Sequence, residues 1–170
     1  MNRTSTESTA PASNEAREPS ALIAFILRRF HQPLRLLLPA LVESTRTIEI
    51  DTRGEALCPR GLAEHIERMR LDLESHLDKE EKILFPLIRS GRGSVALMPI
   101  NVMMAEHQDH ARSLTRMRAL AHDFELPSDA HPSWRALYQQ LEGLQAELRE
   151  HSELEDHVLF PRAAHAETVL

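Results

Sequence analysis

Two copies of one motif combine a histidine with a carboxylate four residues later. The first copy runs from His76 through Glu80 to a Leu-Phe-Pro ending, and the second runs from His151 through Glu155 to the same ending. Residues four apart on an α-helix stand one above the other, so each copy aims an imidazole and a carboxylate in the same direction. Two such pairs that face each other across a helical bundle would form a cage for two metal ions.

The apolar residues around both motifs place these histidines and glutamates at core positions, where a buried carboxylate needs a partner or a metal. The apolar spacing alternates between four and three, as in helical bundles, and continues through both polar pairs. The seams comprise Leu62, Ile66, Met69, Leu73, Leu84 and Leu87 around the first motif, and Leu137, Leu141, Leu144, Leu148 and Val158 around the second. Glu81 and Asp156, five residues after each histidine, are expected to point elsewhere.

Two further histidines, His31 and His107, occupy seam positions of their own. His31 precedes His76 by 45 residues and His107 precedes His151 by 44, so the chain repeats one pattern in two halves. At a rise of about 1.5 Å per residue, an up-down-up-down bundle brings all four histidines to about the same level. Four imidazoles and two carboxylates match the needs of two first-row transition ions, with positions left open for a small ligand.

The predicted fold class is all-α, an up-down-up-down four-helix bundle. Residues 1–18 are poor in hydrophobic residues and are predicted to be a disordered polar tail, followed by one bundle domain over residues 19–167. The first helix is expected at roughly 20–45 with Ser20 as N-cap, followed by a connection over 46–58. The second should begin at Pro59 and end near Ser90, the third should span about 97–123, and the fourth should run from Pro132 to the low 160s.

Composition narrows the function classes. The net charge of −6 argues against binding to nucleic acid or to a membrane surface. No apolar run approaches the roughly 20 residues of a transmembrane helix, and the first 19 residues lack the apolar region of a secretory signal. The single cysteine, Cys58, excludes an internal disulfide. These features predict a cytoplasmic protein.

The donor types favour iron, with manganese or zinc as possible occupants. No thiolate lies near the motifs, which disfavours an iron–sulfur cluster or a Cys-rich zinc site. The order His-x3-Glu also differs from the Glu-x-x-His of ferritin-like proteins. His65 lies 11 residues before His76, about 16 Å along a helix, and is too far away to join the site. His110, one turn after His107, remains open as an extra ligand or as a neighbour of the ligands.

Several stretches resemble the iron–sulfur cluster repair di-iron proteins, the repair-of-iron-centres group with hemerythrin-like domains. The resemblance extends from about residue 20 to residue 165. Besides the two motifs, it includes Phe30-His31…Leu38-Pro39, Cys58-Pro59-Arg60-Gly61-Leu62, Pro99-Ile100-Asn101-Val102-Met103…Glu106-His107 and Trp134-Arg135-Ala136-Leu137-Tyr138.

This resemblance implies a non-haem di-iron centre, with two oxo- or hydroxo-bridged Fe ions and bridging carboxylates. Carried over to this sequence, the metal ligands would be His31, His76, Glu80, His107, His151 and Glu155. The resemblance also implies a role in nitrosative or oxidative stress, in which damaged iron–sulfur clusters are repaired by iron donation or by handling of nitric oxide. The implied partners are NO, O2 and damaged iron–sulfur proteins.

Two departures from the family pattern stand out. Family members often have a further histidine shortly before the Cys-Pro segment, where this chain has Asp51-Thr52, so the site would lose one nitrogen ligand or recruit Asp51 or His110. Members also often carry a short N-terminal domain with adjacent cysteines, where this chain has a polar tail.

Three alternatives remain open, and with them the question of whether the protein is an enzyme. It could be a reversible carrier or sensor of O2 or NO. It could be a di-iron enzyme that reduces NO or removes peroxide. It could also be a structural bundle whose polar network only fixes the register of the helices.

Overall fold

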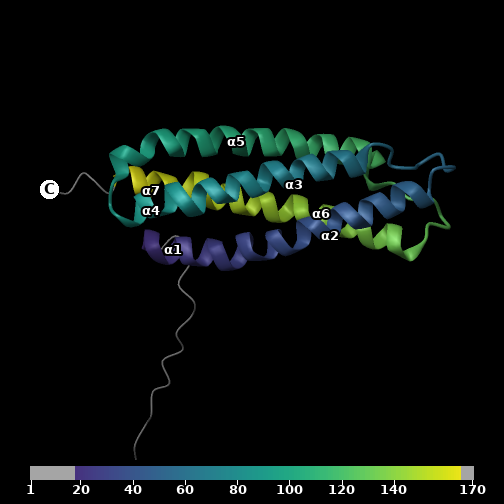
Figure 1. The fold of residues 1–170 in the computed structure, drawn as a ribbon, viewed down its shortest axis with the longest axis horizontal. Helices are drawn as coiled ribbons and strands as arrows, with labels where there is room; N and C mark the ends of the chain where they lie inside the picture. Colours follow the sequence, from purple (N-terminus) through teal and green to yellow (C-terminus); the bar gives the residue numbers. More distant parts are fainter. Residues whose placement is uncertain (1–17, 166–170) are drawn as a thin grey trace, which may run out of the picture.

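Four long helical segments lie side by side along one axis in the computed structural model, which describes residues 18–165 without the side chains of residues 93 and 94 (Figure 1). The first segment comprises α1 (Pro19–Ile26), the π-helical turn η2 (Leu27–His31) and α2 (Gln32–Asp51). The second comprises α3 (Leu62–Lys79), η3 (Glu80–Leu84) and α4 (Phe85–Arg89). The third is α5 (Gly93–Leu120) with the 3-10 turn η4 (His122–Phe124), and the fourth comprises α6 (Pro132–Leu154), η5 (Glu155–Leu159) and α7 (Phe160–His165).

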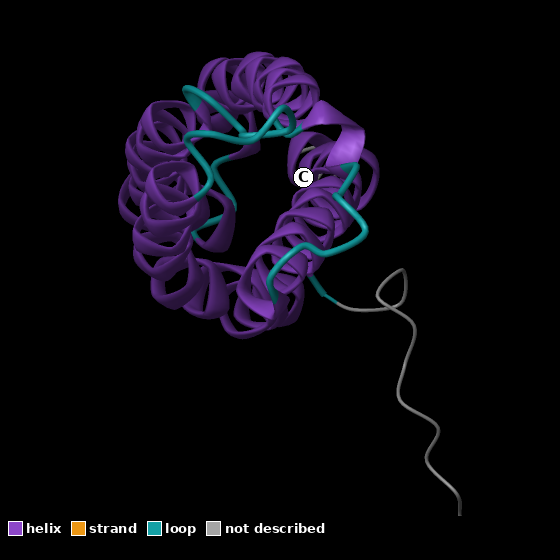
Figure 2. Cartoon of the chain, turned by 90° about the vertical axis from the view of Figure 1, so that its right-hand side faces the viewer, coloured by secondary structure: helices purple, strands orange, loops and turns teal. Residues whose placement is uncertain are grey.

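The end-on view shows these segments as a ring around a common interior (Figure 2). No strand occurs between residues 18 and 165, so the predicted all-α, up-down-up-down bundle is confirmed. The predicted polar tail falls outside the described residues, except for Glu18. Within the described range, no helix combines the length and apolar character that a bilayer crossing requires.

The first helical segment is longer than predicted. It was expected to end near residue 45, but α2 continues to Asp51. Thr45 and Ile48 are both buried and extend the seam from Leu41 at helical spacing. The polar residues between them suggested a connection, yet one buried side chain per turn is enough to hold this stretch on the core.

The second helical segment begins at Leu62, not at Pro59 as predicted. Gly61 precedes it with φ of 80°, a left-handed conformation that glycine adopts without steric cost. The two carboxylate oxygens of Glu49, on α2, accept hydrogen bonds from the backbone N–H groups of Gly61 and Ala63 at 2.8 and 3.0 Å. The start of α3 is therefore fixed by a side chain from the preceding helix. The first segment also starts differently, at Pro19 with Glu18 as N-cap and without a side-chain cap from Ser20.

Three π-helical turns interrupt the segments that carry His31 and the two motifs, and none of them was predicted. A proline follows each turn two residues after its end, at Pro33, Pro86 and Pro161. Proline has no N–H, and its ring clashes with the carbonyl four residues earlier, which in each case lies inside the π turn. The wider turn relieves this clash, so the chain stays helical beyond each Leu-Phe-Pro sequence.

The buried polar residues lie between two apolar clusters. The cluster towards the 52–61 and 121–131 connections includes Leu38, Ile66 and Leu141, and the cluster towards α1, α4 and α7 includes Ile23, Phe85 and Phe160. The helices are thus held together on both sides of the polar layer, and water is kept from it by apolar side chains.

Candidate metal centre

All six predicted ligands meet in one buried layer. Two sets of side chains have donor atoms within 4.8 Å of one another, and both sets include Glu80 and Glu155. The first set adds His31 and His151, and the second adds His76 and His107. Each of two neighbouring positions is therefore offered two imidazoles and two carboxylates.

Each carboxylate presents one oxygen to each position. Oε2 of Glu80 lies 3.3 Å from Nε2 of His31, and Oε1 lies 3.4 Å from Nε2 of His76. Glu155 repeats this arrangement, at 3.3 Å from His107 and 3.1 Å from His151. This is the arrangement that two carboxylates bridging a pair of metal ions require.

The hydrogen bonding of the layer fits a bound metal. Both oxygens of Glu80 and both oxygens of Glu155 are buried and accept no hydrogen bond from the described residues. The Nε2 atoms of His31 and His151 face each other at 3.2 Å, as do those of His76 and His107. Burying carboxylates without partners is costly, and metal cations between these donors would remove that cost.

Glu81 and Asp156 belong to neither donor set, in line with the prediction that they point away from it, but each contacts a predicted ligand on a neighbouring helical segment. Nδ1 of His31 donates a hydrogen bond to Oε1 of Glu81 at 2.9 Å, and Nδ1 of His107 donates to Oδ1 of Asp156 at 2.8 Å. A residue one step after a core position is rotated by about 100° around the helix, which in a bundle can face a neighbouring helix. These carboxylates fix the imidazole tautomer that turns the Nε2 lone pair towards the centre.

A third carboxylate of this kind, Glu106, contacts His76, and its role was not predicted from the sequence. Nδ1 of His76 donates to Oε2 of Glu106 at 2.9 Å, and Lys79 forms an ion pair with the same carboxylate. Its sequence signal was its place directly before the seam residue His107. His151 is held differently, because its ring stacks on Phe30 with centroids 5.1 Å apart.

Burial and mutual contact perturb the pKa values of the layer. Burial lowers the pKa of His31 to about 4 and that of His76 to about 3, which leaves both imidazoles neutral and able to bind metal at neutral pH. Burial also lowers the pKa of His107, but the hydrogen bond to Asp156 and the nearby charge of Glu155 outweigh it and raise the value to about 9.

The pKa values of the two glutamates shift in opposite directions. Burial and the nearby Glu155 raise the pKa of Glu80 well above its ordinary value. Burial acts on Glu155 in the same direction, but the nearby charges of His151 and His107 outweigh it and lower the pKa of Glu155. Burial and neighbouring charge therefore make Glu80 the weaker acid of the pair and Glu155 the stronger one.

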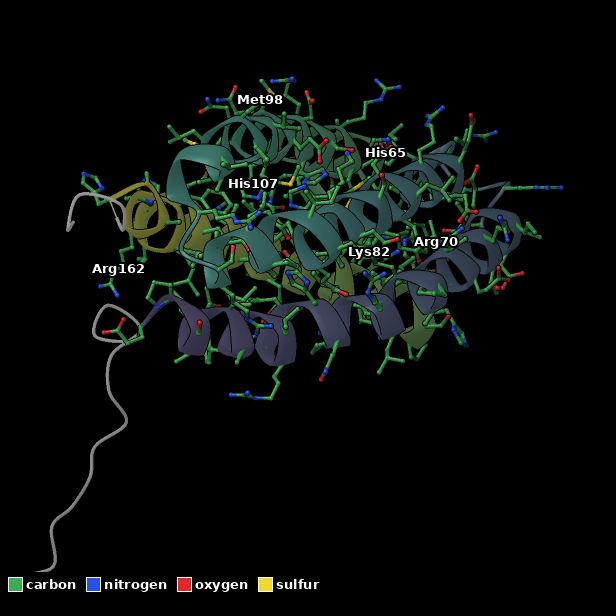
Figure 3. All side chains as sticks on the ribbon, turned by 60° about the vertical axis from the view of Figure 1, so that its left-hand side comes forward. His65, Arg70, Lys82, Met98, His107 and Arg162 are labelled. Carbon is green, nitrogen blue, oxygen red and sulfur yellow. The ribbon has the colours of Figure 1, made fainter. Side chains whose placement is uncertain are left out.

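The sequence left Asp51 and His110 open as further ligands and excluded His65. Asp51 ends α2, about 30 Å of helix away from His31, and belongs to neither donor set. His65 is buried but separate, and its Nε2 donates to the carbonyl of Ser113 at 2.8 Å. His110 lies beside the layer, with its ring centroid 4.7 Å from that of His76. Figure 3 shows His107 and His65 between the helices.

Comparison with known proteins agrees with this geometry. The model of the hemerythrin HHE cation binding domain matches residues 22–166. The iron–sulfur cluster repair protein YtfE of Edwardsiella ictaluri is 44% identical over 142 residues, which cover 84% of this chain and 64% of the relative. YtfE of Pectobacterium carotovorum is 40% identical over 146 residues, covering 86% and 66%. YtfE of Dickeya chrysanthemi is 37% identical over 163 residues, covering 94% and 74%.

The chain spans just under two thirds of the length of the first two relatives. The match to the domain model, over residues 22–166, includes the whole polar layer. The domain model covers most of the chain and describes a domain that binds cations. The buried layer of paired histidines and glutamates is a donor set able to hold such cations. The chain therefore belongs to the hemerythrin HHE cation-binding family and, within it, to the iron–sulfur cluster repair proteins.

Proposed function

We propose that the chain holds two iron ions in the buried layer and takes part in the repair of damaged iron–sulfur clusters during nitrosative or oxidative stress. The ligands in this proposal are the six residues predicted from sequence, with Glu80 and Glu155 as bridges. The observation that carries it is the set of four buried carboxylate oxygens without hydrogen bonds, placed among four imidazole nitrogens. The names of the relatives support the repair role.

The side chains around the layer have distinct parts in this function. The imidazoles bind through Nε2, while Glu81, Glu106 and Asp156 hold them in the matching tautomer. The flanking apolar clusters exclude bulk water and strengthen the electrostatic interactions inside. When bound, two iron ions supply a redox-active pair with coordination positions open to NO or O2.

A cavity beside the imidazoles supports the handling of small ligands as well as iron donation. It has a volume of about 280 Å³, and His76, His107 and His151 are among its lining residues. Reversible binding of NO or O2 is therefore the second candidate function. We place either function in the cytoplasm, where the single cysteine, Cys58, would stay reduced, and the structure has it as a free thiol.

The first test is the iron content per chain after anaerobic purification, together with reactivation of an iron–sulfur enzyme damaged by NO. We expect about two irons per chain, less in Glu80→Ala and Glu155→Ala, and reactivation that depends on loaded protein. Glu153→Ala is the matched control, since Glu153 is exposed on the same helical segment as Glu155. Full loading of both bridge variants would refute the ligand assignment. Loaded protein that restores no enzyme activity would refute the repair role.

A further inference from the structure

The two halves of the chain make matching contacts at the two metal positions. His31 stacks on Phe85 with ring centroids 5.6 Å apart, and His107 stacks on Phe160 at 6.1 Å. Both histidines also donate through Nδ1 to the carboxylate that follows a bridging glutamate on a neighbouring helical segment. Because these contacts match so well, the residues that differ between the two halves show how the two metal positions differ.

The first difference is the residue that precedes the seam histidine in each half. Phe30 in the first half stacks on His151 at an interplanar angle of 13°. Glu106 in the second half accepts a hydrogen bond from Nδ1 of His76 instead. His151 at the first position is therefore backed by an aromatic ring, and His76 at the second by a carboxylate that also contacts Lys79.

The second difference is the residue three places after the seam histidine. In the first half this is Leu34, which is 3% exposed and packs in the apolar core. In the second half it is His110, whose ring meets that of His76 edge-on at 4.7 Å. An additional imidazole thus stands directly against one ligand of the second position, while apolar carbon fills the corresponding place at the first.

Two cavities share His110 as a wall. One has a volume of about 350 Å³ and is lined by Asp72, Glu106, Asp109 and Lys79 among others. The other is the cavity of about 280 Å³ that reaches both histidines of the second position, His76 and His107, but only His151 of the first. His31 lines neither of them. Glu106 pairs with Lys79, and Asp109 pairs with Arg112, so the carboxylates of the larger cavity outnumber these two cations by one. This excess negative charge raises the local concentration of divalent cations.

We propose that the two iron positions exchange at different rates, and that the ion between His76 and His107 is the one that leaves and returns. His110 would offer this ion a further nitrogen donor between the metal position and the cavity lined by Asp72 and Asp109. The ion between His31 and His151 stays in place. This inference rests on the proposed function, since it requires two bound iron ions, and it names the position from which iron is donated.

The test is the kinetics of iron loss from the anaerobic Fe(II)-loaded full chain to an excess of a coloured ferrous chelator. We expect two phases of equal amplitude, and His110→Leu, which installs the residue type of Leu34, should slow the fast phase at least tenfold. Iron content should stay at two per chain. His157→Leu is the matched control, because His157 is exposed and outside both cavities. It should leave both phases unchanged.

Two further variants assign the phases. Asp156→Asn weakens the support of His107 and should accelerate the fast phase only, whereas Glu81→Gln weakens the support of His31 and should accelerate the slow phase only. A single phase with two irons, or an unchanged fast phase in His110→Leu, overturns the inference and leaves the iron centre intact. Binding of less than one iron per chain overturns the proposed iron centre itself.

Discussion

Replacing Glu81 by alanine tests whether the outer carboxylates support the metal layer. Glu81 accepts the Nδ1 proton of His31 at 2.9 Å, and its side chain is 31% exposed. Removal of such a partner from a metal-bound histidine typically costs 10–100-fold in metal affinity, or about 1.4–2.7 kcal/mol. Because Glu81 is partly exposed and also contacts Arg35 at 3.2 Å, we expect the lower end of this range.

The matched control is Asp78→Asn. Asp78 contacts the same arginine, Arg35, at 2.7 Å, but it does not touch His31. This variant disturbs the same surface ion-pair group while leaving the metal ligand supported. The comparison therefore separates loss of support at His31 from a general change in surface charge.

The assay is anaerobic competition for Fe(II) between the protein and a chelator of known affinity. Glu81→Ala should lower affinity at one of the two positions about tenfold, Asp78→Asn should not, and Asp156→Ala should lower affinity at the other position by more. Asp156 is expected to matter more because its side chain is less exposed, at 22%, than that of Glu81. Equal affinities for Glu81→Ala and Asp78→Asn would refute the reasoning.

Three other outcomes follow from the same layer and its surroundings. Removal of metal by a chelator should lower the thermal unfolding midpoint, measured by circular dichroism, because the four carboxylate oxygens lose their only partners. The metal-free protein should also lose stability as pH falls from about 6.5 to about 4, measured by urea unfolding. The folded-state pKa values of His31 and His76 lie below those of the unfolded chain, so the unfolded chain binds more protons, worth about 1.4 kcal/mol per pH unit for each histidine. Proton uptake by Glu80, whose pKa is raised, offsets part of this loss. Gly61→Ala should destabilise the bundle by about 1 kcal/mol in the same urea assay, because alanine is strained at a φ of 80°.

The six central side chains were predictable because their signal lies within single helices. The spacing of apolar residues along one helix shows which of its positions are buried. A histidine or glutamate at a buried position is therefore a candidate ligand even before its neighbours in space are known. Because the pattern is repeated, the histidines of both halves were expected at about the same level along the bundle axis. The structure brings all six residues together in two overlapping donor sets.

The outer carboxylates were missed because their role is defined between helices. Glu81 lies beside the core position on its own helix, and only the position of His31 on the neighbouring segment gives its carboxylate a partner. Glu49 is a similar case, since it caps α3 from α2. The π turns were missed for another reason. A proline is normally evidence that a helix ends, and here the wider turn before Pro86 and Pro161 keeps the helix intact.

The position of the layer between two apolar clusters links its metal content to the stability of the bundle. Apolar packing on both sides holds the helices in place, but Glu80 and Glu155 bring two carboxylates together where water cannot solvate them. Loss of both ions would leave this pair to repel each other at low dielectric, at a cost far above that of a surface pair. Loss of one ion leaves both carboxylates beside the remaining cation, because each belongs to both donor sets. In the proposed two-iron state, loss of iron from only the His76 and His107 position would therefore let the bundle donate metal and stay folded.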